Sequence, residues 1–390
     1  MYLLEHDAKQ LLAAAGIPTP AGVLIEDTRA MPVLPPGPWV VKAQLAAGGR
    51  GKAGGIRKTA TADETRSAIA DISRKLIRGL PVRGCRVEQQ IDGAQEAYLS
   101  LMVDAATAGV RVLLAPRGGV DIETLSTEPG AVRTVICDPD PASIDAGVRG
   151  LCADLAQPLR GALIDAGAAL SQPFFAHECT LLEINPLFVR MDGTWVAGDA
   201  KMITDDNALE RQPALRELLQ TRAAAYPEVA LKLAHGCDYV VVDPAGEIGL
   251  LTTGAGLSMM LVDELRAAGL KPYNFLDVRT GGLRGDPARL VHVLNWIAAG
   301  SRIKVILVNV FAGITDLGEF SRLLLAAIER APHKVPVVAR LVGNGIEAAQ
   351  RVLGDAGIAV ETELDAAVAR VKQHLAEVRV GAERLAPGHG

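Results

Sequence analysis

The stretch that decides the fold of the first half of this chain reads Lys42-Ala43-Gln44-Leu45-Ala46-Ala47-Gly48-Gly49-Arg50-Gly51-Lys52-Ala53-Gly54-Gly55. Five of its last eight residues are glycine. Because glycine has no Cβ atom, such a loop can bring backbone N–H groups close to phosphate oxygens. Lys42, on a predicted strand over 39–44, can reach phosphate as a compact point charge, and Arg50 and Lys52 add positive charge. The stretch indicates a phosphate site, although a flexible surface loop explains the glycines equally well.

A second polar cluster lies far downstream, on a predicted hairpin whose strands span 180–190 and 194–201. If Met191-Asp192-Gly193 forms a three-residue loop with Gly193 left-handed, residues equidistant from Asp192 face each other. Asn185 then lies opposite Asp199, and Glu183 shares their face. A two-residue loop would instead place Asn185 and Asp199 on opposite faces of the hairpin.

An amide oxygen and a carboxylate presented together suit Mg²⁺, which takes oxygen ligands and completes its shell with water and phosphate oxygens. Solvated polar groups at the end of a hairpin are the alternative, and for Asp199 alone that alternative is the better explanation. Taken with the glycine loop and Lys42, the hairpin favours a site that uses ATP and Mg²⁺.

Glu88 and Glu96 lie on two further predicted strands, 85–90 and 96–103, which flank the turn Asp92-Gly93 and are expected to form an antiparallel pair. Their carboxylates could accept hydrogen bonds from the amino or hydroxyl groups of a nucleotide. Solvated strand residues explain them as well, so the residue types alone do not select them.

The other expected elements of the first half are helices. One spans 9–15 and stops at Gly16, a second spans 62–80, and helices fill much of 143–170.

The second half alternates strands with helical stretches, which predicts a parallel, doubly wound sheet. Its strands are expected near 239–242, 249–252, 305–310, 335–341 and 359–361. Two strands run into loops rich in small residues, 252–257 and 311–315. Anions bind at such places, beyond the carboxyl ends of strands and at helix N-termini, although small residues also make ordinary tight turns. We expect domains at 1–222 and 237–380, a connecting segment over 223–236 and a mobile tail at 381–390.

Composition excludes several classes of protein. With 390 residues, 49% of them hydrophobic, the chain is long enough for two or three domains. A net charge of −5 without a basic tract argues against binding to nucleic acid or an anionic membrane. No apolar run is long enough to span a bilayer. The N-terminus lacks the pattern of a secretory signal, so we expect the protein to begin at Met1.

Five scattered cysteines show neither CxxC nor metal-ligand spacing: Cys85, Cys137, Cys152, Cys179 and Cys237. We expect reduced, structural thiols and a cytoplasmic location, although a protein of an organelle matrix would look the same.

Taken together, these residues resemble the β subunit of succinyl-CoA synthetase and its relatives, which include malate-CoA ligase. The resemblance covers nearly the whole length. It is carried by the opening 5–12, the run 42–55, Glu183 to Leu187, Asp199-Ala200-Lys201, Asp206-Asn207-Ala208-Leu209, Asn274-Phe275-Leu276-Asp277-Val278 and Val308-Asn309-Val310-Phe311.

The resemblance implies an N-terminal ATP-grasp domain followed by a flavodoxin-like domain, acting with a separate α subunit. It assigns nucleotide binding to Lys42, Gly49, Arg50, Gly51, Glu88 and Glu96, and Mg²⁺ to Asn185 and Asp199. In such enzymes ATP phosphorylates a histidine of the α subunit, which also carries the CoA site. The phosphoryl group then passes to a carboxylate, and CoA attacks the acyl phosphate. Glu183 would lie near the phosphohistidine, for which this chain offers no candidate of its own.

The chain departs from the family pattern mainly in the second domain, in loops that resemble the carboxylate site. Thr253 stands where Asn is usual, Arg279-Thr280-Gly281-Gly282 replaces a run of three glycines, and Gly313-Ile314 is followed by Thr315-Asp316 without the usual basic residue and cysteine. We take Thr253, Gly313, Ile314 and Thr315 as candidate substrate-binding residues. In the first domain Ala46 replaces a usual histidine. A lost positive charge and a gained Asp316 should change which acid is accepted.

The leading hypothesis is therefore the β subunit of an ATP-dependent, ADP-forming carboxylate-CoA ligase of the succinate type. Malate or another dicarboxylate remains an alternative substrate, and the sequence does not choose between ATP and GTP. An ATP-grasp ligase with a different acceptor is a second hypothesis, which the resemblance of the second domain disfavours. A nucleotide-binding regulatory subunit without turnover is a third.

Overall fold

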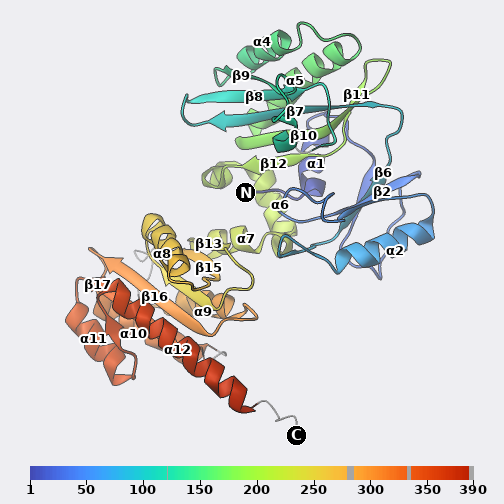
Figure 1. Ribbon diagram of the computed structural model, residues 1–390. Coiled ribbons are helices and arrows are strands. Elements are labelled where there is room, and N and C mark those ends of the chain that lie inside the picture. The colour runs from blue at the N-terminus through green and yellow to red at the C-terminus, as the bar shows by residue number, and fades with distance from the viewer. Residues whose placement is uncertain (121, 279–284, 332–334, 386–390) are drawn as a thin grey trace. The chain divides into compact units, whose positions relative to one another are not determined.

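The computed structural model describes residues 1–120, 122–278, 285–331 and 335–385, and the chain forms two compact units, Met1–Ala225 and Tyr226–Gly390 (Figure 1). The second unit begins with α7 (Pro227–His235), which falls in the segment expected to connect the domains. Across the described ranges, no helix combines the length and apolar character that crossing a membrane requires.

The first unit contains an antiparallel four-stranded sheet that carries Lys42. Its order is β1 (Gly22–Ile25), β6 (Cys85–Gln89), β2 (Trp39–Ala43) and β3 (Ile56–Thr59). Helix α2 (Ala62–Ser73) packs on it, with Ile69 and Ile72 buried among the strand residues. Thr61 and Glu64 form a capping box that starts this helix. The glycine-rich stretch lies between β2 and β3.

A larger antiparallel sheet follows in the same unit. Its order is β11 (Trp195–Ala197), β10 (Cys179–Val189), β7 (Gln95–Asp104), β8 (Gly109–Ala115) and β9 (Arg133–Cys137), and β12 (Lys201–Thr204) also pairs with β10. Helices α4 (Pro141–Leu151) and α5 (Leu159–Ala176) pack against it. The N-terminal helix α1 (Glu5–Ala14) ends before Gly16, whose φ of +81° a helix does not accommodate. The remaining elements are α3 (Ile122–Leu125), α6 (Pro213–Thr221) and two 3₁₀ turns, Asp206–Arg211 and Ala223–Ala225.

Two expectations for this unit are wrong. The strands that flank Asp92-Gly93 do not pair, because β6 already bonds to β1 and β2 on its two edges while β7 bonds to β8 and β10. The segment around Asp92 instead connects two sheets. The helix expected over 62–80 ends at Ser73, and a short hairpin of β4 (Leu76–Ile77) and β5 (Leu80–Pro81) follows. Its turn residues Arg78 and Gly79 have φ of +52° and +77°, which a helix cannot contain.

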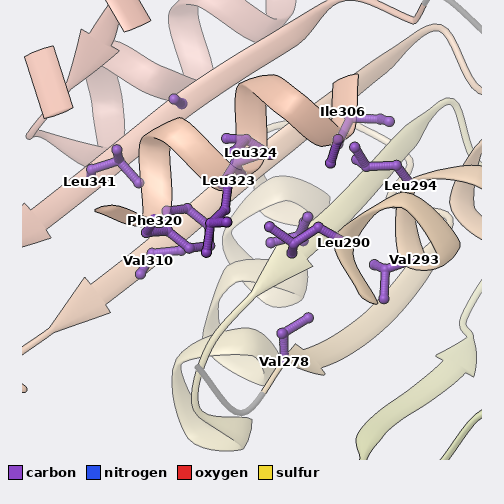
Figure 2. Close-up of a cluster of buried hydrophobic side chains, with 14 of the residues drawn as sticks. Val278, Leu290, Val293, Leu294, Ile306, Val310, Phe320, Leu323, Leu324 and Leu341 are labelled. Atoms are coloured by element: carbon purple, nitrogen blue, oxygen red, sulfur yellow. The ribbon is translucent and has the colours of Figure 1, made fainter. Parts of the chain in front are cut away.

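The second unit holds a parallel sheet with helices on both faces, which confirms the predicted fold class. The order is β14 (Ile248–Thr252), β16 (Val305–Ala312), β17 (Val337–Gly343) and β18 (Val360–Glu361). Alternate residues of β16 serve the two faces. Ile306, Val308 and Val310 join one core with α9 (Ala288–Ala298), α10 (Leu317–Arg330) and α11 (Ile346–Asp355) (Figure 2). Val305 and Leu307 join another with α8 (Ala255–Ala267) and α12 (Leu364–Leu385).

Strand β15 (Asn274–Val278) was not predicted from the sequence. It pairs antiparallel with β13 (Cys237–Val241), so the strand expected near 239–242 lies outside the parallel sheet. Asn274 ties β15 to the edge of β14, because its side chain accepts from the N–H of Leu250 and donates to its C=O, both at 2.9 Å. At the other end, α12 continues to Leu385, so residues 381–385 are helical and only 386–390 of the expected tail lie outside the described residues.

Candidate functional site

The hairpin at 183–201 has the register that the three-residue loop predicts. Leu187 pairs with Ala197, and Glu183 pairs with Lys201, so both pairs are equidistant from Asp192. Gly193 has a φ of +83°, the left-handed conformation that this loop requires. Asn185 and Asp199 fall between the two paired stretches, where the strand ladder is interrupted.

A cavity of about 950 Å³ in the first unit collects the candidate residues of the first half. The glycine loop, β2, β6, the start of β7, the hairpin and the start of α1 all contribute to its wall. The candidates that line it are Lys42, Gly49, Arg50, Gly51, Glu88, Glu96, Glu183, Asn185 and Asp199. Residues more than 150 positions apart thus share one cavity, while their individual roles stay predictions.

Lys42 lies at the centre of a buried ion network. Its Nζ is 2.9 Å from Oε1 of Glu5 and 2.7 Å from Oε1 of Glu88, and it donates to the carbonyl oxygen of Gly198 at 2.6 Å. Burial by itself would lower the pKa of Lys42, but the carboxylates of Glu5 and Glu88 outweigh it and raise that pKa. Lys42 therefore presents a positive charge at the cavity wall.

Arg50 links the glycine loop to the hairpin. Its guanidinium donates to both carboxylate oxygens of Asp199 at 2.8 and 2.7 Å, and lies 2.8 Å from Oε2 of Glu5. It also donates to the carbonyl oxygen of Ala43 at 2.9 Å. Both bonds to Asp199 come from one guanidinium nitrogen, Nη2, while Nη1 faces Glu5 and Ala43. These charge-assisted hydrogen bonds orient the Arg50 side chain between the loop and the hairpin. Arg50 thereby holds the carboxylate of Asp199 at the cavity.

The amide of Asn185 is fixed by the loop that follows β8. Its Oδ1 accepts from the N–H of Gly119 at 2.8 Å, and its Nδ2 donates to the carbonyl oxygen of Val120 at 2.9 Å. Gly119 has a φ of +71°, and a Cβ atom there would lie 1.8 Å from Oε2 of Glu96. The left-handed backbone at Gly119 favours glycine, and a side chain there would also displace the Glu96 carboxylate. Glu183, on the same strand as Asn185, accepts a hydrogen bond from the hydroxyl of Tyr98 at 3.0 Å.

The candidates of the second unit lie where the parallel strands end. Thr253 follows β14, and Gly313, Ile314 and Thr315 follow the neighbouring strand β16. Ile314 is 98% exposed. The side chain of Asp316 caps α10 by accepting from the N–H of Glu319 at 2.8 Å. The run Arg279-Thr280-Gly281-Gly282 lies outside the described residues.

Four residues that contact predicted site residues had no role predicted from the sequence: Glu5, Lys9, Tyr98 and Gly119. The sequence holds one signal for Glu5 and Lys9: their spacing of four residues places two charges on the helix face that carries Leu12, where apolar side chains are expected. Tyr98 and Gly119 had none, because their contacts depend on strand pairing.

All five cysteines are buried and free, which confirms the expectation of structural thiols. Burial raises the pKa of the Cys152 thiol to about 11 and that of Cys179 to about 12. Neither thiol is activated as a nucleophile.

The stability of the first unit should depend on pH through His6. Burial of the imidazole, with Arg86 and Arg222 close by, lowers its pKa to about 4. In the unfolded chain the histidine pKa is about 6.5, so between about pH 6.5 and about pH 4 the unfolded chain binds a proton that the folded chain does not bind. The free energy of unfolding should therefore fall as pH decreases from about 6.5 to about 4, by at most ~1.4 kcal/mol per pH unit. His6→Asn keeps an acceptor for Arg86 and should flatten this slope in urea titrations. Equal slopes for both proteins would contradict the prediction.

Comparisons with known proteins agree with this architecture. A family model of the ATP-grasp domain matches residues 2–189, and one of the CoA-ligase domain matches residues 251–379. The solved ATP citrate lyase of Methanothrix soehngenii, in complex with citrate and coenzyme A, has a TM-score of 0.67 at 18% identity, over 92% of this chain and 95% of that chain. At that identity the likeness shows the fold alone.

Curated relatives that are named succinate–CoA ligase [ADP-forming] subunit beta match along almost the whole chain. The protein of Desulfurococcus amylolyticus is 34% identical over 96% of this chain and 98% of its own length. That of Chloroflexus aurantiacus is 36% identical over 91% and 94%, and that of Thiobacillus denitrificans is 36% identical over 92% and 95%. From these relatives and the two domain matches, the chain belongs to the family of β subunits of ADP-forming succinate–CoA ligases.

Proposed function

We propose that the chain is the β subunit of an ADP-forming carboxylate-CoA ligase and binds ATP in the 950 Å³ cavity of its first unit. The proposal rests on one observation: the side chains that line that cavity include Lys42, Arg50, Asn185 and Asp199. It joins cations suited to phosphates with oxygen donors suited to a hard metal ion. Gly49 and Gly51 line the same cavity and are assigned to the nucleotide, with Glu88 and Glu96.

The oxygen donors fit Mg²⁺, which takes few protein ligands and several from water and phosphate. Asn185 Oδ1 accepts one hydrogen bond and keeps a second lone pair, and the Asp199 side chain is partly exposed at the cavity. The described residues hold no cluster of three or more His, Cys, Asp or Glu side chains suited to a metal ion. Water and phosphate oxygens would complete the shell. Asn185 and Asp199 would hold the ion, which would supply charge to offset phosphate repulsion.

The proposed reaction needs a partner. ATP would phosphorylate a histidine of a separate α subunit near Glu183. The phosphoryl group would pass to a small carboxylate, and the CoA thiol would displace phosphate from the acyl phosphate. Thr253, Gly313, Ile314 and Thr315 are assigned to the acid. Succinate is the first candidate, and malate or another dicarboxylate follows because of Asp316. The free thiols support a cytoplasmic location.

The test is co-expression of the full chain with its α-type partner, followed by an assay of ATP- and CoA-dependent ADP release across a panel of small carboxylates. We expect turnover with succinate or a related dicarboxylate. Nucleotide binding without turnover on any acid would instead support a regulatory subunit. Absence of nucleotide binding would refute the proposal.

Replacement of Asp199 by asparagine should weaken Mg²⁺-dependent ATP binding by roughly tenfold or more. The amide keeps the shape but removes the charge that faces both Arg50 and the ion. Asp104→Asn is the matched control, because Asp104 also pairs with an arginine, Arg111, but lies outside the residues that line the cavity. Calorimetric titration with MgATP measures the affinity of both variants. Unchanged Mg²⁺ dependence in Asp199→Asn would remove Asp199 from the metal assignment.

A further inference from the structure

Lys9 is a buried charge that the proposed reaction does not use. It lies on α1, is 1% exposed and is not among the described residues that line the cavity. An ammonium group in such a place is costly to bury unless its donors are all engaged. Burial lowers the pKa of Lys9, although Glu5 and Glu88 oppose that change.

The contacts of Lys9 duplicate those of Lys42. Lys9 Nζ lies 2.8 Å from Oε1 of Glu5, donates to the two oxygens of Glu88 at 3.0 and 2.8 Å, and donates to the carbonyl oxygen of Gly198 at 2.8 Å. Lys42 uses the same three residues as acceptors, at 2.9, 2.7 and 2.6 Å. Two ammonium groups thus share one set of acceptors, and only Lys42 lines the cavity.

The duplication matters when Lys42 turns toward a phosphate. An ammonium group has three N–H donors, and here Glu5, Glu88 and Gly198 already engage Lys42. A contact with phosphate must replace one of these. Loss of the lysine contact from the Gly198 carbonyl or from a buried carboxylate would oppose the exchange, even with Arg50 on Glu5 and Arg86 on Glu88. Lys9 keeps its contacts with the same three acceptors, so each of them still contacts one lysine when Lys42 turns away.

We propose that Lys9 is a positioning residue of the nucleotide site: by keeping Glu5, Glu88 and the Gly198 carbonyl satisfied, it lets Lys42 exchange a protein partner for a phosphate. This inference rests on the proposed binding of ATP. The N-terminal helix α1 is then part of the nucleotide site although Lys9 touches no nucleotide.

Lys9→Met tests the inference in the full chain. Methionine fills similar space without a charge, and Glu5 keeps Arg50 while Glu88 keeps Arg86, so the variant is expected to fold. Lys42 becomes the only lysine on the shared acceptors, and the dissociation constant for MgATP should rise roughly tenfold. With the α-type partner present, the KM for ATP should rise while kcat changes by less than about threefold.

A double variant and a control separate positioning from mere stability. Adding Glu5→Gln to Lys9→Met removes one carboxylate that holds Lys42, so MgATP affinity should return to within about threefold of the wild-type value. Asp7→Asn is the control: Asp7 is fully buried on the same helix, pairs with Arg222 and is not among the described residues lining the cavity. It should lower the melting temperature without changing MgATP affinity.

The outcomes are distinct. If the wild-type chain does not bind MgATP, the proposed function fails. If it binds MgATP and Lys9→Met binds equally well, or if the double variant binds no better than Lys9→Met, Lys9 is structural only and the inference is overturned.

Discussion

Lys42→Met should lower ATP-dependent turnover of the assembled enzyme by roughly 10²–10³-fold. The Lys42 ammonium is the buried cation of β2 at the cavity, and the carboxylates of Glu5 and Glu88 hold it there. A positive charge at the cavity wall offsets the negative charge of the phosphoryl group during its transfer. Lys42→Arg should rescue little, because a planar guanidinium does not match the position of a compact ammonium group.

Arg57→Met provides a matched control for Lys42. Arg57 lies on the neighbouring strand β3 and forms an exposed ion pair with Asp71. Its loss should leave turnover within about twofold, since exposed pairs contribute little. Steady-state assays of ADP release measure all three variants. If Lys42→Met retained full turnover, the assignment of this cavity to ATP would be wrong.

Phe320→Ala should destabilise the second unit by about 3–5 kcal/mol. Phe320 is 1% exposed on α10 and packs in the core that β16 shares with α9 and α10 (Figure 2). Truncation removes apolar contacts and leaves a cavity that the surrounding helices close only in part. Denaturant unfolding of the full chain, followed by fluorescence and circular dichroism, measures the change.

Phe311→Ala is the comparison within the same unit. Phe311 is 54% exposed at the end of β16, where Arg340 lies 5.3 Å from its ring centroid. Its truncation should change the free energy of unfolding by no more than about 0.5 kcal/mol. Equal effects of the two substitutions would contradict the placement of Phe320 in the core.

Patterns of neighbouring residues predicted those features of the chain that depend on strand alternation and turn conformation. The alternation of apolar strands with helical stretches predicted the parallel sheet of the second unit. Helices cover both faces of that sheet, and alternate β16 side chains pack on one face and then the other. The sequence allowed two turns at Met191-Asp192-Gly193, and the left-handed Gly193 of the structure selects the three-residue turn. The metal hypothesis requires that three-residue turn.

Local patterns failed where the partner of a strand is distant in sequence. The strands on either side of Asp92 have hairpin character, yet each finds both of its partners elsewhere. Backbone hydrogen bonding is not specific to sequence, so proximity along the chain does not decide between two possible neighbours. Strand β15 was missed for a related reason, since its link to β14 runs through the Asn274 side chain.

The sequence by itself predicted the two-part architecture and the chemical character of the glycine loop, because both depend on local residue patterns. The structure decided between the two turns that the sequence allowed for the hairpin at 183–201. Only the tertiary structure decided that Glu5 and Lys9 of the first helix share the surroundings of Lys42 and Glu88. Burial in a common low-dielectric site makes those charges interdependent, and no spacing along the chain records that.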